Sequence, residues 1–252
     1  NDSYTSIQAQ SSVTPWKSLS KLNSFYFSIL PGDSILFKRG DSFFGNIIVS
    51  RPGTSATPII FGAYGSGASP IITGLTPLTS WTAVSSGIYQ SSCSACYINV
   101  NMVTMNGSPK PMGRYPNSGY LAFQSHNGNT SITSSQLPVT NWTGGELVIR
   151  KNHWIIDRNK ITGQSGGTIS YTAASTYTNQ DGNGFFIQNN SQTLDLLGEW
   201  YFNPTGKVMQ MYFGSAHPSS YTVKVSAIDT LVTIMNKGYI TFTGLALQGA
   251  NM

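Results

Sequence analysis

The sequence predicts an all-β fold, and three observations support that prediction. Charged residues make up only 9% of the 252 residues, against roughly 25% in an ordinary soluble domain. Hydrophobic residues reach 39% and aromatic residues 12%, which argues against a disordered chain because such chains lack both. Short runs of Ile, Val and Phe alternate with Gly, Pro, Asn and Ser, which is typical of strands separated by turns.

The one predicted helix lies near the start, in SSVTPWKSLSKLNSF, residues 11–25. Thr14 is a suitable N-cap, and Pro15 follows at the first helical position. Apolar residues from Trp16 to Phe25 then recur at helical spacing. The segment therefore predicts an amphipathic helix of about three turns, whose apolar stripe must cover something.

The pattern changes to short strands in residues 31–74. Four runs, SILFK, NIIVS, PIIFGAYG and PIITG, follow one another about a dozen residues apart. Asn-Gly turns of the two-residue hairpin type are absent from their joints, which argues against a simple meander. Strands that bend rather than reverse are what a parallel β-helix requires, with inward Ile, Val and Leu stacking coil upon coil. The predicted helix would then cover the open end of the first coil.

The chain is predicted to interrupt this pattern and then resume it. LVTIM, YITFTG and LALQG repeat it near the end, whereas GELVIRKNHWIIDRNKITGQSGGTISYT and GEWYFNPTGKVMQMYF predict antiparallel hairpins, the second turning at NPTG. We therefore assign 1–75 to the capping helix and first coils, 76–225 to a β-rich insertion packed on them, and 226–252 to resumed coils. Because so few coils leave the last one uncovered, we expect further coils after Met252.

Charge and hydropathy exclude some partners. The net charge of +5 reflects nine acidic against fourteen basic residues, and the basic residues are scattered, adjacent only at Lys38-Arg39 and Arg150-Lys151. A nucleic-acid interface would need a clustered basic stripe. No segment reaches the roughly 18 apolar residues of a membrane helix. The composition instead fits an exported protein.

The two cysteines lie close together in SSCSACYIN, at Cys93 and Cys96. A zinc site needs four ligands, and there is no second cysteine pair. Thioredoxin-type pairs lie between a strand and a helix, whereas this pair lies in a Ser-rich loop. We expect either a local structural disulfide or two unused thiols.

Several segments together resemble a known group. They are TPWKSLSKLN, PGDSILFKRGDSFFG, PIIFGAYGSGASPIITG, GRYPNSGYL, GEWYFNPTGKVMQMYF and YITFTGLALQGAN. In this respect the chain resembles bacterial right-handed parallel β-helix proteins of the pectate-lyase-like superfamily. The resemblance implies a secreted or cell-surface protein acting on a polysaccharide, as a lyase or glycoside hydrolase whose catalytic coils lie downstream. A non-catalytic glycan-binding or adhesive module is the alternative, and a structural spacer is a third reading.

The candidate glycan-binding residues are Arg114, Tyr115 and Tyr120 in MGRYPNSGYLAF, together with Trp200. An arginine among exposed aromatic rings suits a sugar, which stacks on the rings and hydrogen-bonds to the cation. The structural alternative is that Arg114 anchors the insertion against the β-helix through hydrogen bonds. No catalytic residue is assigned.

A glycosidase would need two carboxylates roughly 5 to 10 Å apart. Asp195 and Glu199 in LDLLGEWYF are the candidate pair, with Trp200 as a stacking platform. The alternation after Gly198 instead predicts that Glu199 begins a hairpin strand and that Asp195 is a loop residue. We favour this structural reading.

No cofactor is expected, although Ca²⁺ has one candidate position. Asp181 and Asn183 in NQDGNG place oxygens close together, but a Gly-rich turn explains the segment more simply. His126, His153 and His217 occur in unrelated contexts, and His153 is predicted to be a half-exposed histidine within a strand.

Overall fold

The computed structural model describes residues 1–97 and 99–251. The prediction of an all-β fold is confirmed, with 40% of residues in strands and 8% in helices. The chain forms two compact units, which we call unit 1 and unit 2 and describe separately. Unit 1 consists of Asn1–Leu78, Ser94–Gly107 and Val223–Met252, and unit 2 of Thr79–Cys93 and Ser108–Thr222.

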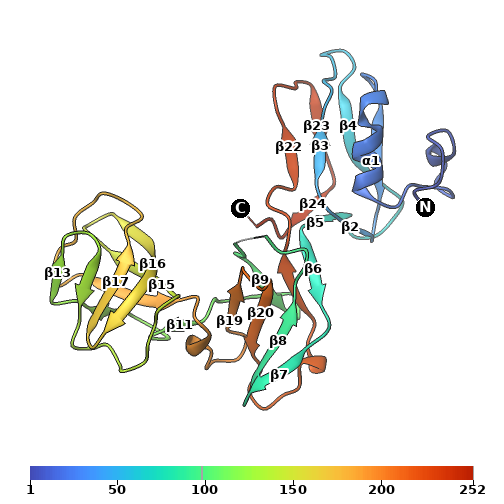
Figure 1. Ribbon diagram of the computed structural model, residues 1–252. Coiled ribbons are helices and arrows are strands. Elements are labelled where there is room, and N and C mark those ends of the chain that lie inside the picture. Colours follow the sequence, from blue (N-terminus) through green and yellow to red (C-terminus); the bar gives the residue numbers. More distant parts are fainter. Residues whose placement is uncertain (98, 252) are drawn as a thin grey trace. The chain divides into compact units, whose positions relative to one another are not determined.

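Unit 1 contains the α-helix and most of the parallel strands (Figure 1). Its elements are η1 (Gln8–Gln10), α1 (Leu19–Phe25), η2 (Tyr26–Ser28), β1 (Ser34–Lys38), β2 (Ser42–Phe44), β3 (Ile47–Val49), β4 (Ile59–Tyr64), β5 (Ile71–Thr73), β6 (Leu75–Leu78), β9 (Val103–Met105), β21 (Val223–Ser226), β22 (Val232–Ile234), β23 (Ile240–Phe242) and β24 (Ala246–Gln248).

The strands at the two ends of the sequence pair with one another in parallel. Strand β4 lies between β1 and β23, β5 lies between β2 and β24, and β3 pairs with β22. In register, Phe61 of β4 faces Ile35 on one side and Phe242 on the other. The strands predicted in 31–74 and after residue 230 are thus present, and β2 was missed because its three residues fall inside a turn-like GDSFFG segment. The remaining sheets are antiparallel.

One apolar cluster fills the space between these parallel strands. Its buried residues are Leu19, Leu22, Tyr26, Ile29, Phe37, Ile47, Val49, Ile59, Phe61, Ile72 and Leu231. The ring of Phe61 stacks on Phe242, with centroids 4.6 Å apart, and on Tyr26, 6.1 Å away. Because this cluster contains residues of α1, η2 and the first strands, with Val232 and Phe242 of the last strands packed against it, it joins segments that are nearly 200 positions apart in sequence.

The helix begins later than predicted. It spans Leu19–Phe25, and its N-cap is Ser18, whose Oγ accepts a hydrogen bond from the Lys21 N–H at 3.1 Å. The predicted N-cap Thr14 instead donates its hydroxyl to the Gln8 carbonyl. The Asp2 carboxylate accepts from the N–H of Ser18 at 3.1 Å and from its hydroxyl at 2.6 Å. These contacts with the N-terminal segment hold the chain outside the helix until Ser18, although Ser18 satisfies the capping rule as well as Thr14 would.

A polar contact fixes α1 to the strand beneath it. The Asn23 side chain accepts a hydrogen bond from the Ile48 N–H at 3.0 Å and donates one to the Asn46 carbonyl at 2.9 Å. Strand β3 pairs with β22 on its other side. The Asn23 amide therefore supplies a donor and an acceptor where a further strand would otherwise be needed.

A second, antiparallel sheet of unit 1 contains β6, β21 and β9. Beside it lies a buried amide, Asn251, which is 4% exposed. Its oxygen accepts from the Asn101 N–H and the Ser226 hydroxyl, and its nitrogen donates to the Asn99 carbonyl and the Asp229 carboxylate. Every polar atom of this side chain is therefore satisfied, as burial requires.

Unit 2 is antiparallel throughout its two sheets. Its elements are β7 (Thr82–Ser85), β8 (Ile88–Ser92), β10 (Ser108–Lys110), β11 (Arg114–Tyr115), β12 (Leu121–Ala122), β13 (Ser125–Asn127), β14 (Ser131–Thr133), β15 (Glu146–Arg150), β16 (Ile156–Ser165), β17 (Thr168–Thr172), β18 (Gly184–Gln188), η3 (Ser191–Thr193), β19 (Trp200–Asn203), β20 (Val208–Tyr212) and η4 (Pro218–Ser220). One sheet has the order β11-β18-β15-β16-β17-β14-β13, with β12 also paired to β18, and the other has the order β19-β20-β8-β7.

Both predicted hairpin regions are confirmed. Strands β15, β16 and β17 form an antiparallel meander, visible together in Figure 1. Strands β19 and β20 reverse at the predicted NPTG turn, where Asn203 Oδ1 accepts from the N–H groups of Thr205 and Gly206. The prediction for His153 is wrong. Because β15 ends at Arg150, whose guanidinium donates to the His153 carbonyl, this histidine lies in an exposed loop rather than in a strand.

An ion pair is buried beside the larger sheet of unit 2. Lys151 is fully buried, and its Nζ lies 2.9 Å from the Asp157 carboxylate and 2.6 Å from Asn129 Oδ1. The Ser175 hydroxyl also donates to Asp157, at 2.5 Å. Burial alone would raise the pKa of Asp157, but the hydrogen bonds from Ser175 and Lys151 and the lysine charge together lower it below its ordinary value.

Two further sequence predictions concern the cysteines and membrane-spanning segments. Cys93 and Cys96 are both disulfide-bonded, so the disulfide alternative holds rather than the unused thiols. Among the residues described, no helix has the length and apolar character needed to traverse a membrane.

Candidate functional site: an arginine and aromatic surface on unit 2

The predicted residue Arg114 lies on a short edge strand. Strand β11 pairs with β18, so that Arg114 faces Gln188. Its Nε donates to the Pro116 carbonyl at 2.9 Å and its Nη2 donates to the Gly119 carbonyl at 2.5 Å. The guanidinium thus holds the loop that follows it. Both hydrogen bonds stay within that loop, so they do not show the anchoring of the insertion against the β-helix that was considered from the sequence. No protein acceptor is found for its Nη1 among the residues described.

Two aromatic rings lie close to the Arg114 guanidinium. Its central carbon lies 3.8 Å from the centroid of the Phe186 ring and 5.8 Å from that of Tyr120. The two rings are 5.9 Å apart, and Tyr120 is 66% exposed. We call these three residues the Arg114 surface. A cation stacked on a ring loses little freedom when it binds a ligand, and the exposed Tyr120 ring offers a flat face to a sugar.

The other two predicted residues do not extend this surface. Tyr115 is half-buried, and its ring stacks on Trp142 at 5.3 Å within the apolar core of the larger sheet. Trp200 is only 2% exposed, and its Nε1 donates to the Lys110 carbonyl at 2.9 Å. The expectation that Trp200 offers a stacking platform is therefore wrong, because strand alternation in β19 directs its ring inward.

The candidate carboxylate pair lies next to the same loop. Asp195 Oδ1 accepts from the Asn117 side chain at 2.9 Å. Glu199 is 2% exposed, and its Oε2 accepts from the N–H groups of Asp195 and Leu196. Burial raises the pKa of the Glu199 carboxyl above its ordinary value, the hydrogen bonds from those N–H groups oppose the rise, and the Asp195 charge adds to it. Because Glu199 is closed off in this turn, the pair anchors the chain ahead of β19, as favoured from the sequence.

The candidate calcium ligands are engaged with protein groups. Asp181 Oδ1 lies 2.6 Å from His126 Nδ1, and the Asn183 amide donates to the Lys151 carbonyl. Among the residues described, no three His, Cys, Asp or Glu side chains gather as they would around a metal ion. The third histidine, His217, caps η4 through the Ser219 N–H.

Phe186 is the residue of the Arg114 surface that the sequence analysis missed. It occurs in GFFIQ, where Phe185 and Ile187 are fully buried and Phe186 between them is half-exposed. The signal was present, because alternation places the middle residue of three consecutive apolar residues on the outer face of a strand. On that face Phe186 meets the Arg114 guanidinium and the Tyr120 ring.

Comparison with known proteins identifies a fold rather than a family. No family model and no curated protein matches the sequence. A solved structure described as a glycoside hydrolase superposes with a TM-score of 0.74 at 14% identity, covering 100% of this chain and 49% of that one. The complex of XylC with xylose superposes with a TM-score of 0.50 at 13% identity, covering 98% of this chain and 34% of that one.

These superpositions show that the chain shares a β-rich fold with part of a protein described as a glycoside hydrolase and with part of XylC. At such low identity the likeness concerns the fold, and a fold hosts many functions. The chain spans about half the length of the first of these proteins and a third of the second.

Proposed function

We propose that this chain is part of a secreted or cell-surface carbohydrate-active protein of bacterial type that acts on a polysaccharide. The observation that carries the proposal is the Arg114 surface, in which an exposed ring and an arginine stand side by side. The fold likeness to a glycoside hydrolase supports it. The low charge and the 12% aromatic content agree with a protein whose ligands are uncharged rings and hydroxyl groups.

The scaffold in this proposal is a right-handed, pectate-lyase-like parallel β-helix closed at its start by α1. The parallel pairings of β1 with β4 and β23, of β2 with β5 and β24, and of β3 with β22 support successive coils. The packing of Leu19 and Leu22 into the core between these strands supports the capping role. In this scaffold, unit 2 is an insertion in the sequence between the early coils and the coil that contains β22, β23 and β24.

The reaction proposed for the whole protein is polysaccharide cleavage, by hydrolysis or by elimination, with the catalytic coils following the present residues. Glu199 is buried and its carboxylate holds a turn, so the close pair of carboxylates weighed from the sequence is given no catalytic role in this proposal. A non-catalytic glycan-binding or adhesive module is the second candidate, and the Arg114 surface fits it equally well. Neither candidate requires a cofactor, and Ca²⁺ at Asp181 stays a separate prediction.

The test is affinity electrophoresis of the chain through gels that contain plant or algal polysaccharides. We expect retention by at least one polysaccharide and a loss of most of that retention in Tyr120→Ala, because the stacking face is removed. Tyr177→Ala is the matched control, since Tyr177 is also an exposed loop tyrosine of unit 2, at 50%. Equal retention of the two variants would contradict the proposal.

A second measurement separates the two candidates. The full-length parent is incubated with the retaining polysaccharide, and new reducing ends and the absorbance of unsaturated uronates are followed. Reducing ends alone indicate hydrolysis, and both signals indicate elimination. Retention with neither signal indicates the binding module.

A further inference from the structure

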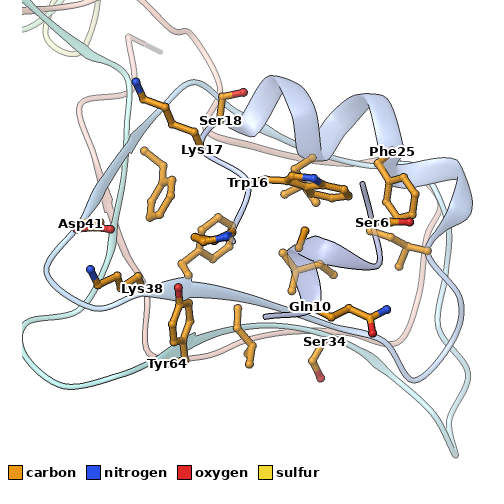
Figure 2. Close-up of a pocket in the computed structure, with 18 of the residues that line it drawn as sticks. Ser6, Gln10, Trp16, Lys17, Ser18, Phe25, Ser34, Lys38, Asp41 and Tyr64 are labelled. Atoms are coloured by element: carbon orange, nitrogen blue, oxygen red, sulfur yellow. The ribbon is translucent and has the colours of Figure 1, made fainter. Parts of the chain in front are cut away.

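Unit 1 contains a cavity that none of the predicted site residues lines. Its volume is about 800 Å³, within the roughly 300–1,000 Å³ typical of small-ligand sites. The cavity lies between the N-terminal segment, α1 and the first two strands, and Figure 2 shows its lining. Five aromatic residues contribute to it: Trp16, Phe25, Phe37, Phe43 and Tyr64.

The Trp16 ring is held in place at the centre of this lining (Figure 2). Its Nε1 donates to the Tyr4 carbonyl at 2.8 Å. Its ring meets the edge of Phe25, with centroids 4.9 Å apart, and the Lys21 ammonium lies 5.5 Å from its centroid. An aromatic ring fixed in this way loses no rotamer freedom when a ligand stacks on it.

Several polar side chains of the lining are left without protein partners. Within the described ranges, no hydrogen bond is formed by the Gln10 amide, the Lys38 ammonium, the Asp41 carboxylate or the Tyr64 hydroxyl. Figure 2 shows Lys38 and Asp41 to the left of the Trp16 ring and the Gln10 side chain below it. Hydrogen-bond donors and acceptors thus line the same cavity as the apolar Trp16 ring. Such a site suits a ligand whose ring stacks on the tryptophan and whose hydroxyl groups form hydrogen bonds with the polar side chains.

The charge of the lining distinguishes between kinds of sugar. Lys17 and Lys38 are balanced by Asp33 and Asp41, so that the charged side chains of the lining carry no net charge. Because the two carboxylates offset the two ammonium groups, the side chains of the lining offer no net attraction to an acidic glycan, and a neutral glycan needs no such attraction. We propose that this cavity is a binding site for a neutral oligosaccharide, which stacks on Trp16 and hydrogen-bonds to Gln10 and Asp41.

Isothermal titration of the whole chain with neutral hexasaccharides, cellohexaose and xylohexaose, tests the site, with hexagalacturonate as the acidic comparison. We expect at least one neutral ligand to bind and hexagalacturonate to bind at least tenfold more weakly. Trp16→Phe should weaken neutral binding about tenfold. The matched control is Trp154→Phe, because Trp154 is a tryptophan of unit 2 that is 79% exposed, and this variant should bind as the wild type does.

Two further variants keep the test decisive if Trp16→Phe disturbs folding. Gln10 and Asp41 are exposed, so Gln10→Ala and Asp41→Asn should fold normally and weaken neutral binding severalfold. Absence of neutral binding, preference for hexagalacturonate, or wild-type affinity in both variants would overturn the proposal. Because Tyr120 belongs to the other unit, Tyr120→Ala should leave this binding unchanged, so the cavity and the Arg114 surface succeed or fail separately.

Discussion

The two units close their interiors with different chemistry. In unit 1 the Phe61 ring stacks on those of Phe242 and Tyr26, and the buried Asn251 amide is neutral and forms four hydrogen bonds. Unit 2 buries a charge, because Lys151 is fully enclosed and is balanced by Asp157.

The difference follows from how the strands are paired. Parallel strands place like residues in register on successive strands, so rings stack on rings, as Phe61 does on Phe242. The antiparallel sheet of unit 2 ends in loops, and Lys151 lies in one of these, where its charge holds Asn129 and Ser175 of two other loops. The stability of a stacked core falls most when side-chain volume is removed. The stability of a network centred on a buried charge falls most when the counter-charge is removed. The predictions below test this contrast.

The largest effect is expected from Phe61→Ala. Phe61 is fully buried between two stacked rings, and removal of such a ring costs about 3–5 kcal/mol. Hydrogen exchange should become faster in β1, β4 and β23. Exchange that changes as much in β15–β17 as in these strands would contradict a locally stacked core.

Asp157→Asn should cost unit 2 about 3 kcal/mol, because it leaves the buried Lys151 charge without its partner. Denaturant unfolding and hydrogen exchange in β15–β17 measure the loss. Arg158→Gln is the control on the same strand, since the Arg158–Glu146 pair is largely exposed on the arginine side, at 51%, and exposed pairs contribute roughly 0–1 kcal/mol. Equal costs for the two variants would remove the distinction.

The Asp157 pair also predicts a dependence on pH. Because its folded pKa lies below the ordinary value of 3.8, its contribution to stability is complete above that value. It is lost as the pH falls through the lowered folded pKa. The free energy of unfolding of the wild type should therefore decrease more steeply than that of Asp157→Asn between about pH 5 and pH 2. Parallel curves would show that the carboxylate is not linked to folding.

Asn23→Ala should destabilise unit 1 by about 1–2 kcal/mol, since the N–H of Ile48 and the carbonyl of Asn46 lose their partners. At neutral pH the carboxylate of Asn23→Asp can still accept from Ile48 but cannot donate to Asn46, so its cost should be intermediate. A thermal unfolding temperature unchanged in Asn23→Ala would show that α1 is held by its apolar face alone.

Tyr26→Phe gives the smallest effect, with the opposite sign. The Tyr26 hydroxyl is buried and finds no hydrogen-bond partner in residues 1–97 and 99–251, and burial raises the pKa of Tyr26 to about 12. Because an unsatisfied hydroxyl is costly to bury, its removal should stabilise the chain by about 1 kcal/mol. A loss of stability would mean that the hydroxyl is hydrated or bonded.

Local pattern was sufficient for most of the fold. Runs such as SILFK and PIITG have a strand composition and turn residues at both ends, so β1 and β5 were predicted within one or two residues. The hairpin at NPTG was also readable, because Asn203 sets the turn through its own side chain. The alternation after Gly198 predicted a hairpin strand beginning at Glu199, and β19 begins one residue later, at Trp200.

The candidate site was only partly predictable. The sequence grouped Arg114 with Tyr120, which are near neighbours in the chain, but Phe186 reaches them only through the pairing of β11 and β12 with β18. The cavity of unit 1 was not predicted, because Gln10, Trp16 and Asp41 come together through the path of the N-terminal segment.

The sequence by itself determined which segments are strands, where the chain turns and that an interruption separates two stretches of similar strands. These features depend on residues within about ten positions of one another. Only the tertiary structure decided where the helix begins, that Trp200 is buried, and that Lys151 finds Asp157. Each of these outcomes depends on contacts between distant segments, such as that of Asp2 with Ser18, and no local pattern encodes such contacts.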